Sequence, residues 1–142
     1  MAKNSLREKA NKLKQITKEA IEQITLDVCK RNENYAIELN WQQLEVGKDR
    51  LGNTLKPYTE RYAKQKGRKL PNLRLTGDFW LAFTLDISNG FPIELTSTDE
   101  KTALLIKRYG ENIFNLNQVN TAKFAKYVQP QIEAEIRKLL QL

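Results

Sequence analysis

One stretch of the chain has a large apolar residue at every odd-numbered position, and it reads Phe79-Trp80-Leu81-Ala82-Phe83-Thr84-Leu85-Asp86-Ile87. After Ser88-Asn89-Gly90 the odd-numbered apolar positions resume as Phe91, Ile93 and Leu95. A period of two residues is typical of a β-strand with one buried face. The sequence therefore predicts a β-hairpin over Leu75–Leu95, with Phe79, Phe83, Ile93 and Leu95 in the core of the fold.

The turn of this hairpin is indicated by the Asn89-Gly90 pair, because both residues tolerate a positive φ. A two-residue turn would place Leu85 opposite Glu94 and would mix core and solvent residues on each face. A three-residue turn with Gly90 in the left-handed conformation places Leu85 opposite Ile93, and we predict this register. Gly77 is predicted to turn the chain into the first strand.

Residues 1–46 are predicted to be a helical region. Ser5 and Glu8 have the spacing of a capping box, and apolar residues follow at intervals of three and four: Leu6, Ala10, Leu13, Ile16, Ala20, Ile24 and Val28. The polar stretch Arg31–Asn34 predicts a bend or the start of a second helix, which ends at Gly47.

The segment after the hairpin predicts two further helices. Thr98–Tyr109 is expected to be helical, with Ser97 as its N-cap and Gly110 after its end. A strand over Ala103–Ile106 is the open alternative, because so short an apolar run does not settle its period. A terminal helix is expected from about Asn120, with a kink at Pro130. Together these elements predict a single α+β domain over residues 1–142, with an antiparallel sheet in a β-rich core (75–117) and a C-terminal helix (118–142).

Positive charge is concentrated between Gly47 and Arg74. This segment carries nine Lys or Arg side chains against two carboxylates, an excess of seven that equals the net charge of the whole chain. Asp49 and Gly52 are predicted to form a turn, and Pro57–Lys66 a short helix that stacks Tyr58 on Tyr62. A plain solvated surface is one interpretation of this segment, and a surface that binds an acidic partner is the other. The predicted contacts to such a partner are six basic residues: Lys56, Arg61, Lys64, Lys66, Arg68 and Lys69.

Composition argues against several kinds of chemistry. The sequence has no His and a single Cys, so neither a disulfide within the chain nor a zinc site of His and Cys ligands is expected. Every His-activated nucleophile is excluded as well. We expect no enzyme activity, no cofactor and no metal. Neither a secretory signal nor a membrane segment is expected in this sequence, which suggests use in a reducing cytoplasm.

The order of several short motifs resembles a known family. The motifs are Gly47-Lys48-Asp49-Arg50-Leu51-Gly52, Leu55-Lys56-Pro57-Tyr58 with Tyr62, Leu75-Thr76-Gly77-Asp78-Phe79, and Tyr109-Gly110 before Ile113. Together they resemble the tail-completion, or virion morphogenesis, proteins of tailed bacteriophages. The resemblance implies a non-enzymatic neck protein of the virion, made in the bacterial host cytoplasm, that forms a homo-oligomeric ring at the head-tail connector. Its implied partners are further copies of itself, the portal, adaptor or tail proteins, and passing DNA; no membrane is implied.

Two other interpretations remain open at the level of sequence. A basic nucleic-acid-binding protein is indicated by the pI near 9.5 and by the tyrosine pair among Lys and Arg side chains. A cytoplasmic scaffold unrelated to phages is the third.

Overall fold

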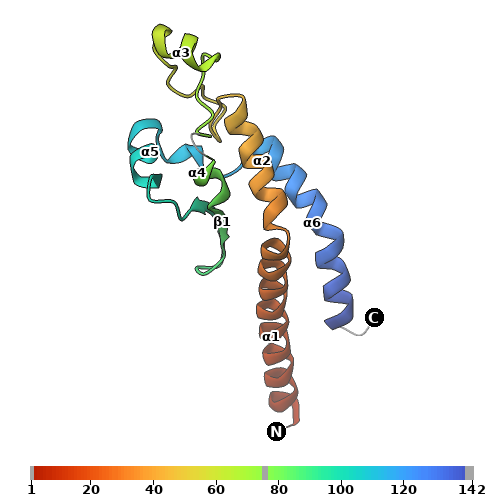
Figure 1. Cartoon of the computed structure of the whole chain (residues 1–142). Helices are drawn as coiled ribbons and strands as arrows, with labels where there is room; N and C mark the ends of the chain where they lie inside the picture. Colours follow the sequence, from red (N-terminus) through yellow and green to blue (C-terminus); the bar gives the residue numbers. More distant parts are fainter. Residues whose placement is uncertain (1, 75–76, 140–142) are drawn as a thin grey trace.

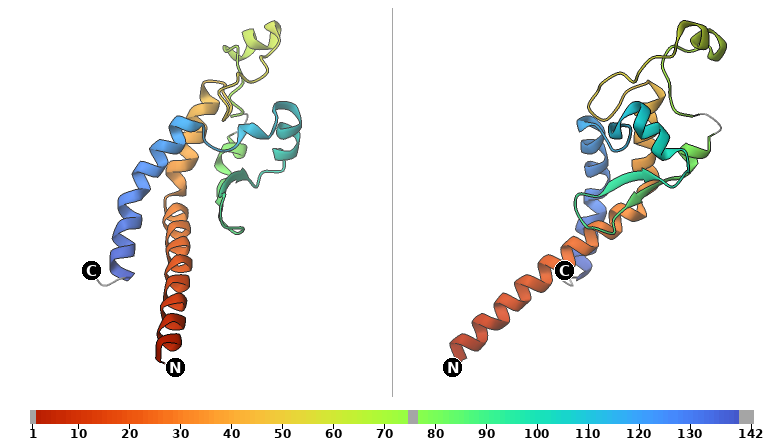
Figure 2. Two further views of the ribbon diagram at one scale, coloured as in Figure 1. Left: turned by 180° about the vertical axis from the view of Figure 1, so that it is seen from behind. Right: turned by 90° about the vertical axis from the view of Figure 1, so that its left-hand side faces the viewer.

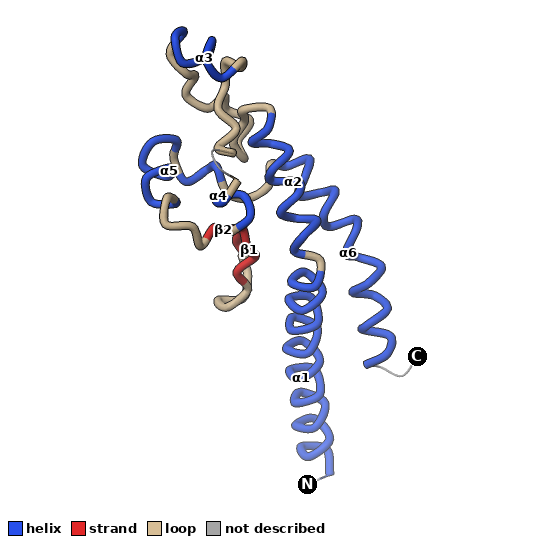
Figure 3. Tube along the Cα trace, viewed as in Figure 1, coloured by secondary structure: helices blue, strands red, loops and turns tan. Residues whose placement is uncertain are grey.

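The computed structural model describes residues 2–74 and 77–139, and in this range the chain is a mixed structure of helices and one antiparallel hairpin (Figures 1 and 3). Its elements are α1 Ala2–Arg31, α2 Glu33–Glu45, α3 Glu60–Lys66, α4 Asp78–Leu81, β1 Phe83–Asp86, β2 Glu94–Ser97, α5 Thr102–Tyr109, the 3-10 turn η1 Glu111–Ile113, and α6 Gln118–Leu139. The predicted α+β class, with a long N-terminal helix and a C-terminal helix, is confirmed. Leu75, the predicted start of the hairpin, lies outside the described residues.

The helix α2 stands between two layers of the molecule (Figure 2). On one side it contacts β1, and on the other it packs against α6, which runs back along α2 and the end of α1. Tyr35 of α2 meets Tyr127 and Phe124 of α6, with ring centroids 4.6 and 6.2 Å apart. None of the helices described is long and apolar enough to cross a membrane.

The bend predicted between the first two helices occurs at Asn32. Both its backbone N–H and its side-chain amide donate to the carbonyl of Val28, at 3.2 and 2.8 Å, and so satisfy the end of α1. The same side-chain amide donates to Gln131 of α6 at 2.9 Å. The prediction of a bend or second helix is confirmed, and Asn32 also ties the bend to α6.

An aromatic cluster lies at the centre of the core. Phe79, Phe83 and Phe114 are in mutual contact, with centroid distances of 5.1 to 5.8 Å. Of the predicted core residues, Phe79, Phe83 and Leu95 are buried, while Ile93 is half-buried and packs against the cluster of buried residues.

The first half of the predicted strand is helical, so the hairpin was placed too early in the chain. Residues 78–81 form the single turn α4, after Gly77 with a φ of 90°. This turn buries Trp80 and leaves Leu81, an odd-numbered position predicted to be core, 79% exposed. Trp80 stacks on Trp41 of α2 with centroids 5.4 Å apart, and its indole N–H donates to the Asn72 carbonyl at 3.0 Å. These contacts outweigh the local alternation.

The predicted strand register is also wrong, by two residues. Leu85 pairs with Leu95 and Asp86 with Glu94, so the side-chain faces are kept but the connection is longer than three residues. The strand ends at Asp86 because its carboxylate accepts hydrogen bonds from the N–H and the hydroxyl of Ser88, at 2.9 and 2.6 Å. Gly90 is left-handed, with a φ of 70°, as predicted.

Side chains cover both outer edges of the two-stranded sheet at its middle pair. Glu33 accepts a hydrogen bond from the Leu85 N–H at 3.1 Å, and Lys30 donates to the Leu85 carbonyl at 2.7 Å. On the other strand, the Leu95 N–H donates to the side-chain oxygen of Asn115 at 2.7 Å. Both edges are therefore partly occupied from within the chain, which leaves less of each edge free to pair with a neighbouring strand.

A chain of buried amides joins α2 to the segment that leads into α6. Asn40 is fully buried; its amide donates to the Ile113 carbonyl at 2.9 Å, and its oxygen accepts from the Asn115 N–H at 2.8 Å. One turn later Gln43 donates to the Asn115 carbonyl at 3.0 Å and accepts from Asn120 of α6 at 2.9 Å. Asn40 and Gln43 of α2 thus satisfy the backbone carbonyl of Ile113 and both backbone groups of Asn115.

Several helices and strands begin or end at other residues than predicted. Ser5 lies inside α1, which begins at Ala2, so it is not the N-cap. Ser97 belongs to β2, where its hydroxyl donates to the Phe79 carbonyl at 3.0 Å, and α5 begins later, at Thr102. The open question at Ala103–Ile106 is decided for helix. Residues 77–117 hold α4, α5 and η1 in addition to both strands, and Pro130 lies within α6.

Candidate docking surfaces

The segment from 47 to 74, here called the basic arm, leaves α2 and carries α3 to the end of the molecule farthest from the N-terminus (Figure 1). Its first turn is built as predicted on Asp49, whose carboxylate accepts from the N–H groups of Leu51 and Asn53, both at 2.9 Å. The N–H of Gly52 closes the turn onto the Asp49 carbonyl at 3.0 Å.

The outer part of the basic arm is a short helix between two extended stretches. The helix α3 begins at Glu60 rather than at Pro57, with the Thr59 hydroxyl as its N-cap, and ends at the left-handed Gly67. The predicted contact between Tyr58 and Tyr62 is confirmed as an edge-on pair with centroids 4.8 Å apart. Tyr58 also donates its backbone N–H to the Lys69 carbonyl at 3.0 Å, which joins the two extended stretches.

Five of the six predicted docking residues have exposed side chains on the arm: Lys56, Arg61, Lys64, Lys66 and Lys69. The sixth, Arg68, is half-buried and anchors the arm to α2. It makes a 3.1 Å ion pair with the Glu45 carboxylate and donates to the Glu45 carbonyl at 2.7 Å and to the Leu70 carbonyl at 2.6 Å. Arg68 is therefore engaged within the chain.

Where the arm meets α2 and α4 there is a cavity of about 730 Å³, here called the basic pocket. Its lining is Trp41, Tyr58, Lys66, Arg68, Asn72, Arg74, Gly77, Trp80 and Leu81. Among the described residues that line it there are three cations and no carboxylate. The basic pocket thus combines positive charge with aromatic and aliphatic surface.

The basic pocket was not predicted from the sequence, although two cations of its lining, Lys66 and Arg68, were predicted as docking residues. Its wall is a stack in which the guanidinium of Arg74 lies 5.3 Å from the Trp80 ring centroid, and Trp80 lies nearly parallel to Trp41 at an angle of 16°. Periodicity placed Trp80 on a strand and Trp41 on a separate helix. No local pattern indicated that they would meet.

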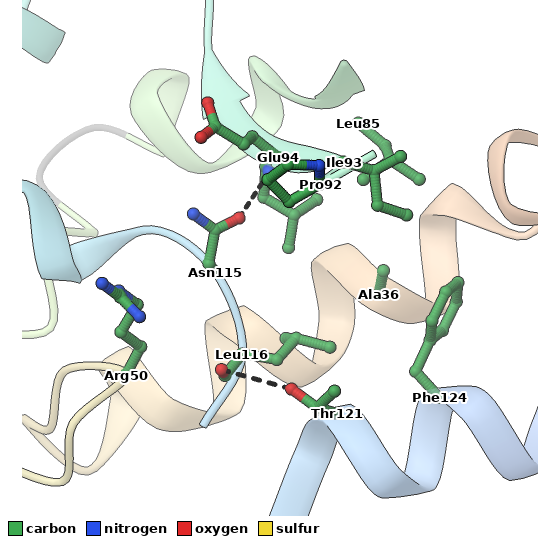
Figure 4. Close-up of a pocket in the computed structure, with 11 residues that line it drawn as sticks. Ala36, Arg50, Leu85, Pro92, Ile93, Glu94, Asn115, Leu116, Thr121 and Phe124 are labelled. Atoms are coloured by element: carbon green, nitrogen blue, oxygen red, sulfur yellow. Dashed lines mark hydrogen bonds between the residues drawn. The ribbon is translucent and has the colours of Figure 1, made fainter. Parts of the chain in front are cut away.

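A second concave surface, here called the hairpin groove, lies between the hairpin, α2 and α6 (Figure 4). It encloses about 390 Å³ and is lined by Ala36, Arg50, Leu85, Pro92, Ile93, Glu94, Leu95, Asn115, Leu116, Thr121 and Phe124. Figure 4 shows Arg50 at the opposite end from Phe124, with the Pro92–Glu94 stretch along one side. Its lining is mostly apolar, with one cation and one carboxylate.

The first part of α1 extends away from the rest of the molecule (Figures 1 and 2). Among the α1 side chains that the structure describes, those that belong to the core or pack on it come late in the helix: Ile24, Val28 and Cys29. Near the start, Leu6 is 67% exposed, and Ala10 is exposed as well. The chain therefore carries an uncovered apolar helix face and an apolar groove at separate places.

The arrangement of carboxylates and of the single cysteine bears on metal binding and on thiol reactivity. Within residues 2–74 and 77–139, no group of three Cys, Asp or Glu side chains is placed to hold a metal ion. Cys29 is buried, and burial raises the pKa of its thiol, which favours the unreactive protonated form.

Comparison with models of known protein families, with curated proteins and with solved structures finds no match to this chain.

Proposed function

We propose that the chain is a non-enzymatic structural protein of a bacteriophage virion, a neck or tail-completion protein that forms a homo-oligomeric ring at the head-tail connector. The observation that carries the assembly part of this proposal is the uncovered start of α1, with Leu6 67% exposed, on a chain that also has the hairpin groove. The phage setting rests on the motif order from Gly47 to Ile113.

A ring requires heterologous contacts, in which two different patches of each subunit meet head to tail. We assign the uncovered face of α1 to one patch and the hairpin groove to the other. An amphipathic helix in an apolar groove is a common recognition mode, with anchors on one helix face. Among the side chains that the structure describes at the start of α1, Leu6 is large, apolar and exposed, and it is the expected anchor.

The basic arm is the proposed docking surface toward the portal, an adaptor or a tail protein. Its exposed lysines would be repeated around the ring, so a modest attraction per subunit is multiplied by the number of subunits. An acidic protein surface is the preferred partner, with passing DNA second.

The oligomeric state tests the assembly part of the proposal. Sedimentation velocity of the purified chain should give particles of several subunits, and Leu6→Glu should reduce them to monomer, because the substitution places a charge in an apolar contact. Leu104→Glu is the matched control, since Leu104 is 66% exposed on α5 and lies in neither patch. A monomer at all concentrations, or equal effects of both substitutions, contradicts the proposal.

Cysteine cross-linking tests which surfaces meet. In a Cys29→Ala background, Leu6→Cys protein is mixed with Ile93→Cys protein under mild oxidation. Head-to-tail contact predicts a mixed disulfide between the two variants. Disulfides of Leu6→Cys with itself, without the mixed species, would show symmetric pairing of α1 and would contradict a ring.

The alternative function, binding of nucleic acid, is favoured by the Tyr58–Tyr62 pair, which lies among the exposed lysines of the basic arm. It predicts an affinity for DNA that falls steeply as salt rises, because each phosphate contact releases counterions. If the chain has no measurable affinity for DNA at low salt, nucleic-acid binding is excluded as its function.

A further inference from the structure

We propose that the basic pocket binds a linear segment of a partner protein in which carboxylates alternate with aliphatic side chains. The inference rests on the proposed docking function in one respect, the acidic character of the partner. It goes further in naming the pocket, the chemistry of the bound segment and the residues that contact it.

The charge of the pocket selects the acidic part of the segment. Arg68 already pairs with Glu45 at 3.1 Å, which leaves Lys66 and Arg74 as the lining cations with exposed side chains. Lys66 has its amine 5.7 Å from the Tyr62 centroid, and Arg74 lies over Trp80. Contact with an aromatic face restricts each cation while its remaining N–H donors can still reach an acceptor, so both are oriented for carboxylates.

Apolar surface at the rim selects the aliphatic part. Leu81 is 79% exposed and lines the pocket together with the half-buried Trp41. A large exposed leucine beside a tryptophan is the kind of surface that interfaces cover with an apolar anchor. A segment with carboxylates alone would leave Leu81 uncovered.

The state of the aromatic rings argues against a nucleic acid as the occupant. Single strands bind by stacking bases on open aromatic faces. Trp80 is only 8% exposed, is stacked on Trp41 and carries Arg74 over its ring. A base would have to displace these contacts, whereas a carboxylate would add to them.

The pocket contains its own reporter, because Trp41 and Trp80 are the two tryptophans of the sequence. The full chain is titrated with a short synthetic peptide of alternating Glu and Leu while intrinsic fluorescence is recorded. Two control peptides replace every Glu by Gln or every Leu by Ser, and an oligothymidylate represents single-stranded DNA. The anisotropy of labelled peptide and labelled oligothymidylate gives a second readout that does not depend on the tryptophans.

The expected result is binding of the Glu-Leu peptide, with each control peptide weaker by roughly fivefold or more, the factor expected for loss of about 1 kcal/mol. Arg74→Gln and Lys66→Gln should each weaken binding by a similar factor. Arg137→Gln, on the exposed side of α6, should leave it unchanged. Equal binding of the three peptides, or no binding, overturns the proposal, and tighter binding of oligothymidylate overturns it in favour of nucleic acid.

The outcome is separable from that of the ring proposal. A chain that stays monomeric in sedimentation velocity and still binds the Glu-Leu peptide contradicts the ring and supports the pocket. A chain that forms rings and does not bind the Glu-Leu peptide supports the ring and contradicts the pocket.

Discussion

Glu33 and Lys30 lie on either side of the break between α1 and α2, and both contact the outer edge of β1. Their 2.8 Å ion pair is combined with hydrogen bonds to the N–H and carbonyl of Leu85. Burial alone would raise the pKa of Glu33, but the hydrogen bonds from Lys30 and Leu85 and the charge of Lys30 outweigh it and lower the pKa below its ordinary value of 4.5. A lowered pKa means that the folded state favours the carboxylate.

The contribution of Glu33 to stability should therefore depend on pH. It is fully present above the ordinary pKa of 4.5 and is lost as the pH falls through the lowered folded value. Near neutral pH, Glu33→Gln should lower the free energy of unfolding by about 1 kcal/mol, and this deficit should shrink on acidification. Urea denaturation across acidic pH measures it. Glu38→Gln, at an exposed site on α2, is the control, and a deficit independent of pH would contradict the assignment.

Asn40 offers a second test at the scale of one residue. Replacing it with Leu keeps the branching at Cγ and adds some volume, and it leaves the Ile113 carbonyl and the Asn115 N–H without their 2.9 and 2.8 Å partner. An unsatisfied buried group is costly, so the free energy of unfolding should fall by about 2 to 3 kcal/mol. Asn34→Leu, on the exposed side of α2, should change it by less than about 0.5 kcal/mol. Similar losses for the two variants would show that the amide network is unimportant.

At the scale of elements, the two glycines that close helices of the basic arm region have different surroundings. Gly47 follows α2 and Gly67 follows α3, and both have a φ of 72°. A Cβ built on Gly47 would lie 2.7 Å from the Cβ of Leu70, whereas at Gly67 nothing lies within 4 Å. The end of α2 is therefore packed directly against the returning stretch of the arm, while the end of α3 is open.

This difference predicts unequal costs for the same substitution. Gly67→Ala should destabilise the chain by about 1 kcal/mol, the cost of a left-handed residue with a side chain. Gly47→Ala carries that cost and the contact with Leu70, so its loss should be larger by about 1 to 3 kcal/mol. Thermal or chemical denaturation of the two variants gives the comparison. An equal loss at both sites would mean that the arm does not pack on Gly47.

At the scale of the whole molecule, two extensions leave a body formed by α2, α6 and the hairpin. One is the start of α1, and the other is the basic arm with α3 near its tip (Figure 2). The arm is held to α2 by Arg68, while Lys56, Lys64, Lys66 and Lys69 remain exposed. We propose that the start of α1 joins subunits to one another and that the basic arm binds a partner protein.

Charge reversal separates these roles. Changing Lys64, Lys66 and Lys69 to Glu should leave the circular dichroism spectrum and the ring unchanged, because all three side chains are exposed. It should prevent attachment of the ring to its partner, measured as the yield of infectious particles. Reversal of three exposed lysines elsewhere, Lys107, Lys123 and Lys126, gives the same change in net charge as a control. A normal yield of infectious particles from the first variant would show that the basic arm is only a solvated surface and not a docking surface.

The sequence by itself determined the features that depend on neighbours a few residues apart. Helical spacing placed α1, and poor helix formers placed the bend near Asn32. Gly47 and Gly110 marked helix ends because few other residues accept their backbone angles. The turn on Asp49 followed from its own carboxylate, and the excess of positive charge located the basic arm and its exposed lysines.

Only the tertiary structure decided the features that depend on distant partners. The stack of Trp80 on Trp41 turned the predicted start of a strand into α4 and created the basic pocket, from residues that local patterns assigned to unrelated elements. The strand register follows the turn at Asp86 and the caps supplied by Glu33 and Asn115, two side chains far away in the sequence. Arg68 resembled its exposed neighbours until Glu45 was placed beside it. Periodicity reports which face is apolar, but the choice of partner depends on contacts that form only when the chain has folded.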